Sequence, residues 1–288
     1  MIAVWIILGS IALLALIYLY LIGTRIFKKP DMSHFKSYLY AHRGLHDNES
    51  DAPENTLVAF QKAVDADFGI EFDVHLSKDD VPVIFHDGTL ERMCGVKGHV
   101  WDYTLKELKK FRILGTDQEI PTLREALEII RDRVPILVEY KLHNVSAKVC
   151  GIANPILEEY GCDYMIESFQ PMALWWYRRH RKNVVRGMLS YHFAKDGYTN
   201  PLYLILKNLL FNHSARPDFI AFHKEHINLV TVNVCKKVYK PQMAAWTIKS
   251  ENELEKAREY FDMFIFDSFV PEAERETLVI GDGDVMPE

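Results

Sequence analysis

Short apolar segments rich in Val, Ile, Phe and Tyr alternate with helical patterns from residue 38 to residue 266, and this alternation constrains the fold more than any other feature. Strand–helix repeats of this kind build a parallel sheet covered by helices. The principal strands are expected at residues 38–42, 70–76, 135–140, 164–168, 184–189, 219–222, 243–247 and 263–266. A short strand at 81–86 forms a hairpin with the second of these. The pattern predicts an α/β fold, a TIM (β/α)8 barrel with a β-hairpin extension after strand 2.

The length and composition of the chain fit one such barrel. It has 288 residues, of which 49% are hydrophobic and 26% are charged, as in a globular protein with a core. Helices are expected at 54–67, 104–111, 123–131, 146–160, 172–181, within 203–211, at 230–238 and at 251–260. The net charge of −6 argues against nucleic acid as a partner, because nucleic-acid binding needs a basic face.

An apolar segment precedes the barrel. Residues 2–23 contain no charged side chain, and a helix of this length reaches roughly 33 Å, enough to cross a bilayer. A cleaved signal peptide is the alternative, but no Lys or Arg precedes the apolar run as a signal peptide would require. Arg25, Lys28, Lys29 and Lys36 follow the run. The positive-inside tendency therefore predicts a single-pass membrane protein with its globular domain in the cytoplasm.

These features divide the chain into four segments. We expect a transmembrane anchor at 1–24, a basic juxtamembrane linker at 25–37, the barrel at 38–272 and a C-terminal tail at 273–288. The four cysteines form neither a CxxC pair nor a zinc-binding spacing, so we expect them to be buried or idle thiols. The sequence carries no signal for the oligomeric state.

Polar residues that end apolar strands are the candidates for the site, because the chemistry of a TIM barrel lies at the carboxyl ends of its strands. In chain order they are His42 and Arg43, Glu71 and Asp73, His86, and Glu139 and Lys141. The acidic pair of the second strand is spaced two residues apart, as is the Glu–Lys pair of the third barrel strand. Each pair therefore points to one face of its strand.

Glu71, Asp73 and Glu139 suggest a metal site. Three acids that converge on a barrel mouth repel one another unless a cation neutralises them. Their oxygen ligands suit a hard divalent ion, either Mg²⁺ or Ca²⁺. A solvated strand face is the alternative for the pair on the second strand, but that pair lies between apolar neighbours, and a charged pair that points inward needs a partner.

The remaining candidates suit a phosphodiester. His42 and His86 come from different strands and can act as acid and base on either side of a phosphorus atom. Arg43 and Lys141 supply cationic donors for phosphate oxygens. A single histidine at a strand end is more often structural, but all these residues together at strand ends indicate a catalytic site.

At these positions the chain resembles the glycerophosphodiester phosphodiesterases. The matching motifs are His42-Arg43-Gly44, Pro53-Glu54-Asn55-Thr56, Glu71-Phe72-Asp73-Val74, His86-Asp87 and Glu139-Tyr140-Lys141, with weaker matches at Trp246-Thr247 and Phe266-Asp267. The resemblance covers about residues 38–270 and implies a barrel of the phosphatidylinositol-phospholipase-C-like type with one divalent cation. The last strand departs from it, reading Phe-Ile-Phe-Asp-Ser-Phe where the family often has Thr-Asp-x-Pro.

The resemblance also implies roles. Glu71, Asp73 and Glu139 would hold the metal, His42 and His86 would be the acid–base pair, and Arg43 and Lys141 would contact the phosphate. Glu54 would support the first loop or contact the metal or the glycerol, while Asn55 and Thr56 would organise the helix start. The implied reaction is metal-dependent hydrolysis of glycerophosphodiesters to an alcohol and sn-glycerol 3-phosphate.

The substrate is left open by the sequence. Phe169, Trp246 and the apolar stretch 201–211 could line or cap a lipid-binding mouth. The stretch could equally pack on the barrel wall or make a second contact with the bilayer. Cleavage of lysophospholipids in the manner of a lysophospholipase D is therefore an alternative. A catalytically inactive barrel that only binds at the membrane is another, although no metal ligand or histidine is missing.

Overall fold

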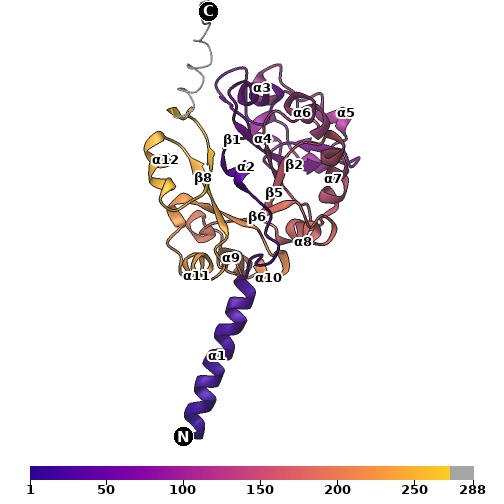
Figure 1. Cartoon of the computed structure of the whole chain (residues 1–288). Coiled ribbons are helices and arrows are strands. Elements are labelled where there is room, and N and C mark those ends of the chain that lie inside the picture. Colours follow the sequence, from indigo (N-terminus) through magenta and orange to yellow (C-terminus); the bar gives the residue numbers. More distant parts are fainter. Residues whose placement is uncertain (273–288) are drawn as a thin grey trace, which may run out of the picture.

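Eight parallel strands close into a barrel in the computed structural model, which describes residues 1–272 and, of Asp196, only the backbone. The strands are β1 (Leu39–His42), β2 (Gly69–Leu76), β4 (Ile136–Tyr140), β5 (Tyr164–Ser168), β6 (Val185–Ser190), β7 (Phe219–His223), β8 (Gln242–Ile248) and β9 (Met263–Phe266). Each pairs with the next in this order, and β1 pairs with both β2 and β9, which closes the ring (Figure 1). The predicted TIM barrel is confirmed, whereas the predicted tail at 273–288 lies outside the described residues.

Two apolar layers explain why these segments form strands. Both faces of the barrel strands are buried, so the strands read as nearly continuous apolar runs, as expected for a parallel sheet. One layer lies between the strands and the surrounding helices and includes Phe72 and Val138. The other fills the barrel and includes Leu137 and Phe219. Successive side chains of each strand therefore alternate between the barrel interior and the helices.

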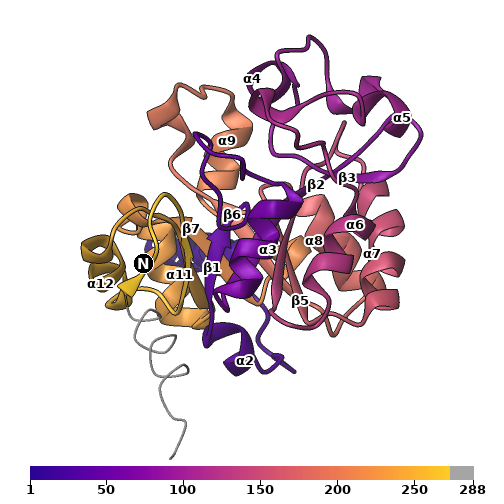
Figure 2. The same ribbon diagram turned by 90° about the horizontal axis from the view of Figure 1, so that it is seen from above.

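Helices surround the barrel (Figure 2). The longer ones are α3 (Leu57–Asp65), α6 (Leu123–Ile130), α7 (Lys148–Tyr160), α8 (Pro171–His180), α9 (Pro201–Lys207), α11 (Val230–Tyr239) and α12 (Glu251–Arg258). Short turns of helix are α2 (Ser33–Lys36), α5 (Leu105–Leu108) and α10 (Asn212–Ala215).

The first barrel helix begins later than the sequence pattern indicates. α3 starts at Leu57 rather than near Glu54, because Thr56 is its N-cap and accepts a hydrogen bond from the backbone N–H of Ala59 at 3.3 Å. The backbone φ of Asn55 is 59°, which is incompatible with a continuous helix. Glu54 consequently lies in the turn before the helix.

The predicted extension after strand 2 is present as a longer arm. β3 (Pro82–Ile84) pairs antiparallel with β2, and α4 (Glu91–Cys94) and α5 follow it. The arm has an apolar core of its own that includes Val83, Phe85 and Leu108. In Figure 2 the arm projects from the same side of the barrel as α9.

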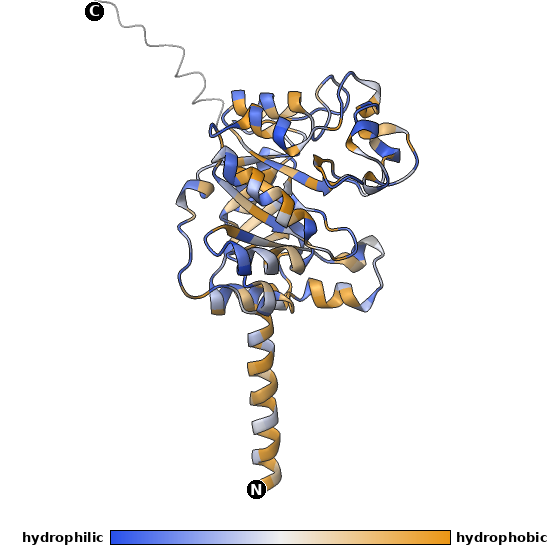
Figure 3. Ribbon diagram, turned by 90° about the vertical axis from the view of Figure 1, so that its right-hand side faces the viewer, coloured by the Kyte–Doolittle hydropathy of each residue, from blue (hydrophilic) through white to orange (hydrophobic). Residues whose placement is uncertain are grey.

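One helix leaves the globular part. α1 (Ile2–Ile22) projects from the barrel, and its apolar surface is exposed along most of its length (Figures 1 and 3). It is the one helix among residues 1–272 that is long and apolar enough to cross a membrane. Its last turn is different, because Ile22 is fully buried and its carbonyl accepts a hydrogen bond from Asn212 at 3.1 Å. The Tyr239 hydroxyl donates to the carbonyl of Leu19 at 2.6 Å. The last turn of α1 is thus part of the packed domain.

Candidate active site

The alternation along the strands turns the candidate acids into the barrel. Glu71 and Asp73 on β2 and Glu139 on β4 each lie between apolar residues that pack against the helices, so their own side chains point inward. The register places Asp73 beside Glu139 and His42 beside Glu71. The predicted acids from two strands and the first histidine are therefore brought together at one end of the barrel.

The three acids form a compact buried cluster. Glu71, Asp73 and Glu139 each offer a carboxylate oxygen, and these oxygens lie within 4.8 Å of one another. The Lys141 ammonium lies 2.9 Å from Asp73 Oδ1 and 2.6 Å from Glu139 Oε1. The amide of Asn55 donates to Asp73 Oδ2 at 2.9 Å. The backbone N–H of Arg43 donates to Glu71 Oε2 at 2.9 Å, and the Nε atom of Arg43 lies 3.7 Å from Asp73 Oδ2. Two cationic side chains, of which Arg43 is shared with Glu54, leave the three converging carboxylates short of positive charge.

The pKa values reflect this crowding. Burial, reinforced by the charges of Asp73 and Glu139, holds the pKa of Glu71 well above its ordinary range. Burial also raises the pKa of Glu139 to about 7, although Lys141 opposes the shift. Burial disfavours ionisation of Asp73 too, but Lys141, His86 and Arg43 outweigh it and lower the pKa of that carboxyl. Three buried carboxyls with too few cationic partners to ionise together fit a hard divalent ion.

Each of the two candidate histidines is held by a carboxylate. His42 Nδ1 donates to Asp267 Oδ2 at 2.8 Å, and His86 Nδ1 donates to Asp87 Oδ1 at 2.7 Å. With Nδ1 occupied, the Nε2 atom of each ring is the one available for proton transfer. Burial lowers the pKa of His42, against the opposing effect of Asp267. Burial, together with the charge of Lys141, lowers the pKa of His86.

Both histidines face one small cavity of about 130 Å³. Its lining also includes Arg43, Glu71 and Glu139. Acid–base groups, a cationic donor and two members of the acid cluster thus share a space that can hold a phosphate group.

Glu54 lies beside the cavity rather than in it. It accepts hydrogen bonds from Arg43 at 2.7 Å, from Asn48 at 3.0 Å and from both terminal nitrogens of Arg92 at 2.7 and 2.9 Å. Burial opposes its ionisation, but the hydrogen bonds from Arg92 and the charge of Arg43 lower the pKa of Glu54 to about 2. Its geometry is that of a carboxylate that orients Arg43.

A wider pocket of about 600 Å³ opens next to the small cavity. His86, Phe169 and Trp246 line both spaces, so the two are continuous. The rings of Phe169, Trp246 and Tyr191 meet edge to face, with centroids 5.5 to 5.9 Å apart. The indole N–H of Trp246 is buried and has no hydrogen-bond partner among residues 1–272, so it can donate to a bound molecule. Phe169 and Trp246, which the sequence suggests as lining of a lipid-binding mouth, both line this pocket and the small cavity.

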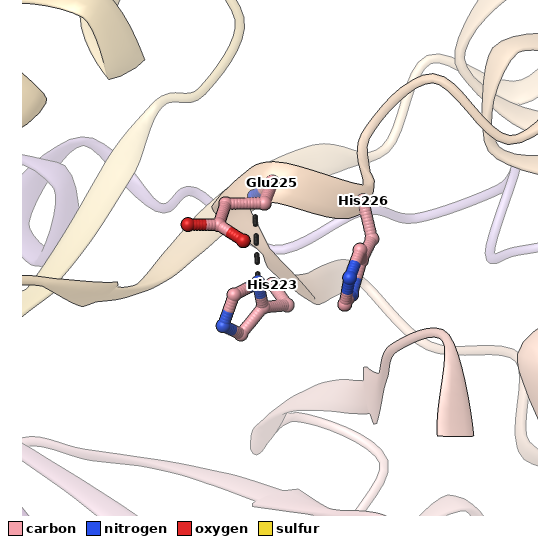
Figure 4. Close-up of side chains that lie close together, drawn as sticks. All are labelled: His223, Glu225 and His226. Atoms are coloured by element: carbon pink, nitrogen blue, oxygen red, sulfur yellow. Dashed lines mark hydrogen bonds between the residues drawn. The ribbon is translucent and has the colours of Figure 1, made fainter. Parts of the chain in front are cut away.

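His223, Glu225 and His226 form a second cluster of potential ligands on the rim of this pocket (Figure 4). The backbone N–H of Glu225 donates to His223 Nδ1 at 3.4 Å, and the N–H of His192 donates to His226 Nδ1 at 3.3 Å. A neutral imidazole whose Nδ1 accepts a hydrogen bond carries its proton on Nε2. This tautomer makes both rings hydrogen-bond donors to the pocket and argues against metal ligation by them.

Four site residues are absent from the sequence-based set. Glu167 on β5 lies beside Glu139 in register and lines the small cavity. It is the penultimate residue of an apolar strand, so the rule applied to the other strands would have found it. Asp87 and Asp267 stand in the recognised motifs but have no predicted role, although they hold the two histidines. Arg92 lies on α4 of the arm, where no local pattern marks it.

Known proteins resemble this chain over most of its length. Residues 42–267 match the glycerophosphoryl diester phosphodiesterase family. A glycerophosphodiester phosphodiesterase from Caldanaerobacter subterraneus is 29% identical over 236 residues, covering 77% of this chain and 89% of that protein. One from Bacillus altitudinis is 36% identical over 139 residues, but the match covers only 46% of this chain and 53% of that protein.

Solved structures share the fold. A phosphodiesterase from Oleispira antarctica, in complex with the product sn-glycerol-3-phosphate, has a TM-score of 0.66 at 24% identity, covering 84% of this chain and 96% of that one. A glycerophosphodiester phosphodiesterase from Thermotoga maritima has a TM-score of 0.61 at 24% identity, with 84% and 97% covered. The family match spans most of the chain, and we conclude that it belongs to the glycerophosphoryl diester phosphodiesterase family, whose members are phosphoric diester hydrolases.

Proposed function

We propose that this protein hydrolyses glycerophosphodiesters to an alcohol and sn-glycerol 3-phosphate with one divalent cation, Mg²⁺ or Ca²⁺. The observation that carries the proposal is the small cavity in which two carboxylate-held histidines face a buried acid cluster. Glu71, Asp73 and Glu139 would hold the ion. When bound, it would supply positive charge to the phosphoryl oxygens.

The cationic side chains position the phosphate in this proposal. Arg43 is fixed by Glu54 and lines the cavity, so its guanidinium can bind two phosphoryl oxygens without further ordering. Lys141 lines the wider pocket and is neutralised in part by Asp73 and Glu139. Fixed donors of this kind stabilise charge that develops in the transition state.

The two histidines divide the proton transfers. His86 lines both spaces, so it is placed to protonate the alcohol that leaves toward the wider pocket as the bond between phosphorus and alcohol oxygen breaks. His42 lines the small cavity and is placed to accept the proton of the attacking hydroxyl or water as the new bond to phosphorus forms. Asp267 and Asp87 orient the rings for these transfers.

This division can be tested with two leaving groups. His86→Ala should slow glycerophosphocholine hydrolysis by about 100-fold or more, the usual contribution of general acid catalysis. A p-nitrophenyl ester of glycerol phosphate needs no protonation of its leaving group, so its hydrolysis should depend little on His86. His42→Ala should slow both substrates. Equal losses with both substrates in His86→Ala would contradict the assignment.

Lysophospholipids are a second candidate substrate, favoured by the surroundings of the wider pocket. Tyr198 lines this pocket and is followed by α9, on which Leu202 and Leu204 are 47% and 57% exposed. In Figure 1, α9 lies at the end of the domain from which α1 emerges. An acyl chain in the bilayer could therefore approach the pocket along α9.

Matched variants separate the two substrates. Leu204→Asp should reduce hydrolysis of lysophosphatidylcholine in vesicles and leave hydrolysis of soluble glycerophosphocholine unchanged. Leu114→Asp, at an exposed leucine of the arm, is the control and should change neither. If Leu204→Asp leaves lysophosphatidylcholine hydrolysis intact, α9 does not serve lipid access.

We also propose that α1 is an uncleaved anchor that crosses the membrane once, with the barrel on the cytoplasmic side. Without the packed last turn, the 17 residues from Ile2 to Tyr18 span roughly 26 Å, which is at the lower end of the helix lengths that cross a hydrocarbon core. The packed last turn supports retention of α1, because cleavage after it would expose the pocket that holds Ile22. An N-terminal tag should stay on the mature protein, and external protease should spare the barrel in intact cells. Loss of the tag would refute the anchor.

A further inference from the structure

A basic pocket lies against the end of α1, on the opposite side of the barrel from the active site. Its volume is about 420 Å³. Residues 24–27, which directly follow α1, form one wall. Four cationic side chains line the rest of it, namely Arg178, Lys182, Arg186 and Arg216, and Arg25 adds a fifth from the first wall. Arg186 stands near the amino end of β6, whereas the active site lies at the carboxyl ends of the strands, so the two sites are separate.

The positive charge of this pocket is poorly compensated. Asp218 is the carboxylate next to it, 3.2 Å from Arg25 and 3.8 Å from Arg186. Arg178 donates to the backbone carbonyls of His213 and Ser214 and has no carboxylate partner within residues 1–272. The described residues likewise offer no acidic partner to Lys182. The pocket therefore presents an excess of cations to whatever occupies it.

Arg186 is a buried cation of this pocket whose charge is also poorly compensated. Its side chain is 4% exposed, and its Nη1 atom finds no hydrogen-bond acceptor in the part of the chain that the structure describes. Its Nε donates to the carbonyl of Ala215 at 3.0 Å. Burial, against the opposing charge of Asp218, lowers the pKa of Arg186 to about 10. A buried guanidinium with an unused donor is the kind of group that an anionic ligand satisfies.

The position of the pocket indicates the source of the anion. Because the last turn of α1 is packed into the domain, no free linker separates the apolar helix from the pocket wall. Ile26 and Phe27 on that wall are 54% and 83% exposed, next to the cationic groups. Apolar side chains that enter the bilayer beside clustered Arg and Lys are the surroundings of a lipid headgroup.

We propose that this pocket binds the phosphate of an anionic phospholipid in the leaflet that contacts the domain. The shared chemistry is a phosphate ester held by guanidinium groups, which bind such oxygens in pairs. The proposal rests on the membrane anchor proposed above and is independent of the catalytic assignment. A bound lipid would fix the orientation of the barrel relative to the bilayer.

The test uses the full-length chain in nanodiscs of phosphatidylcholine and phosphatidylglycerol in equal amounts. Native mass spectrometry of the released protein should find phosphatidylglycerol retained in preference to phosphatidylcholine. Lys182→Gln should lower this preference by about fivefold, the usual effect of one basic residue at a membrane surface. Lys106→Gln, an exposed lysine on α5 of the arm, is the charge-matched control and should leave it unchanged.

Two further measurements keep the outcome clear. Phosphatidylglycerol in the nanodisc should raise the unfolding temperature, and inorganic phosphate added to the protein in phosphatidylcholine nanodiscs should not. An equal rise with inorganic phosphate would assign the pocket to a soluble phosphate and overturn the lipid proposal. Glycerophosphocholine hydrolysis by Lys182→Gln should equal that of the wild type, which shows that the variant is folded. Equal retention of the two lipids by the wild type would also overturn the proposal, whatever the hydrolytic activity proves to be.

Discussion

Replacing Glu71 with Gln separates the metal role of the acid cluster from a structural role. The cluster oxygens lie within 4.8 Å of one another. At an effective dielectric constant of about 20, two unit charges at that separation repel by about 3.5 kcal/mol. Burial and this repulsion hold the pKa of Glu71 well above its ordinary range, which favours the protonated acid in the metal-free protein. Gln is close in shape to the protonated acid.

The expected result therefore depends on the cation. In EDTA, Glu71→Gln should unfold at nearly the wild-type temperature, because one neutral side chain replaces another. Excess Mg²⁺ or Ca²⁺ should stabilise the wild type by about 2.7 kcal/mol at a hundred times the dissociation constant. The variant should show little of this stabilisation and little hydrolysis, because a neutral amide is a poor substitute for a carboxylate ligand.

Differential scanning fluorimetry of the detergent-solubilised full chain measures both effects. Glu167→Gln is the matched control, since Glu167 is a buried acid of the same cavity outside the cluster of three. It should keep the cation-dependent rise in unfolding temperature. A cation-dependent rise in the unfolding temperature of Glu71→Gln as large as that of the wild type would refute the reasoning. Strong destabilisation of that variant in EDTA would refute it too.

Three other predictions concern the histidines and the first helix. His42→Ala and His86→Ala should each reduce glycerophosphocholine turnover by about 100-fold or more while circular dichroism stays unchanged; near-full activity in either would remove it from the acid–base pair. Activity should fall as the pH drops below 6.5, because protonation of His42 removes the base. Asp267→Asn should move this acidic limb of the pH–activity profile to lower pH, since Asp267 raises the pKa of His42. A shift of the limb to higher pH would contradict the effect of Asp267 on His42. Thr56→Ala removes the N-cap of α3 and should lower the free energy of unfolding by about 1 kcal/mol, as measured by denaturant titration. An unchanged free energy of unfolding would mean that the cap is dispensable.

Local spacing explains why much of the site could be predicted. Glu71 and Asp73 are two residues apart in an apolar strand, and so are Glu139 and Lys141, which fixes the shared face of each pair before any tertiary contact is known. The eight-strand pattern then places these faces at one end of a barrel. Strand periodicity and the barrel rule together are sufficient for the positions of the acids.

The partners of the site residues depend on closure of the barrel and on loop geometry. Asp267 lies 225 residues from His42 in the chain, and only the pairing of β9 with β1 brings them together. The helical pattern places Glu54 on the first helix, but the cap at Thr56 leaves it in a turn facing Arg43. Spacing within one segment holds no information about such contacts.

The docking of α1 was equally hidden from the sequence. Uniform apolar composition predicts a helix that crosses a membrane, but it does not distinguish the turn that Asn212 and Tyr239 hold from the turns that remain exposed. The basic pocket likewise draws its cations from segments that are separated by up to 191 positions and share no motif. Only the folded arrangement reveals these features.

The central claim is most directly tested by a product assay on the purified full-length protein. Glycerophosphocholine, glycerophosphoethanolamine, glycerophosphoglycerol and lysophosphatidylcholine are each incubated with Mg²⁺, with Ca²⁺ or with EDTA, and the released glycerol phosphate or lysophosphatidate is measured. The account predicts cation-dependent cleavage of at least one glycerophosphodiester, with sn-glycerol 3-phosphate as product and complete loss in EDTA. Absence of cleavage with either cation, or undiminished cleavage in EDTA, would contradict it.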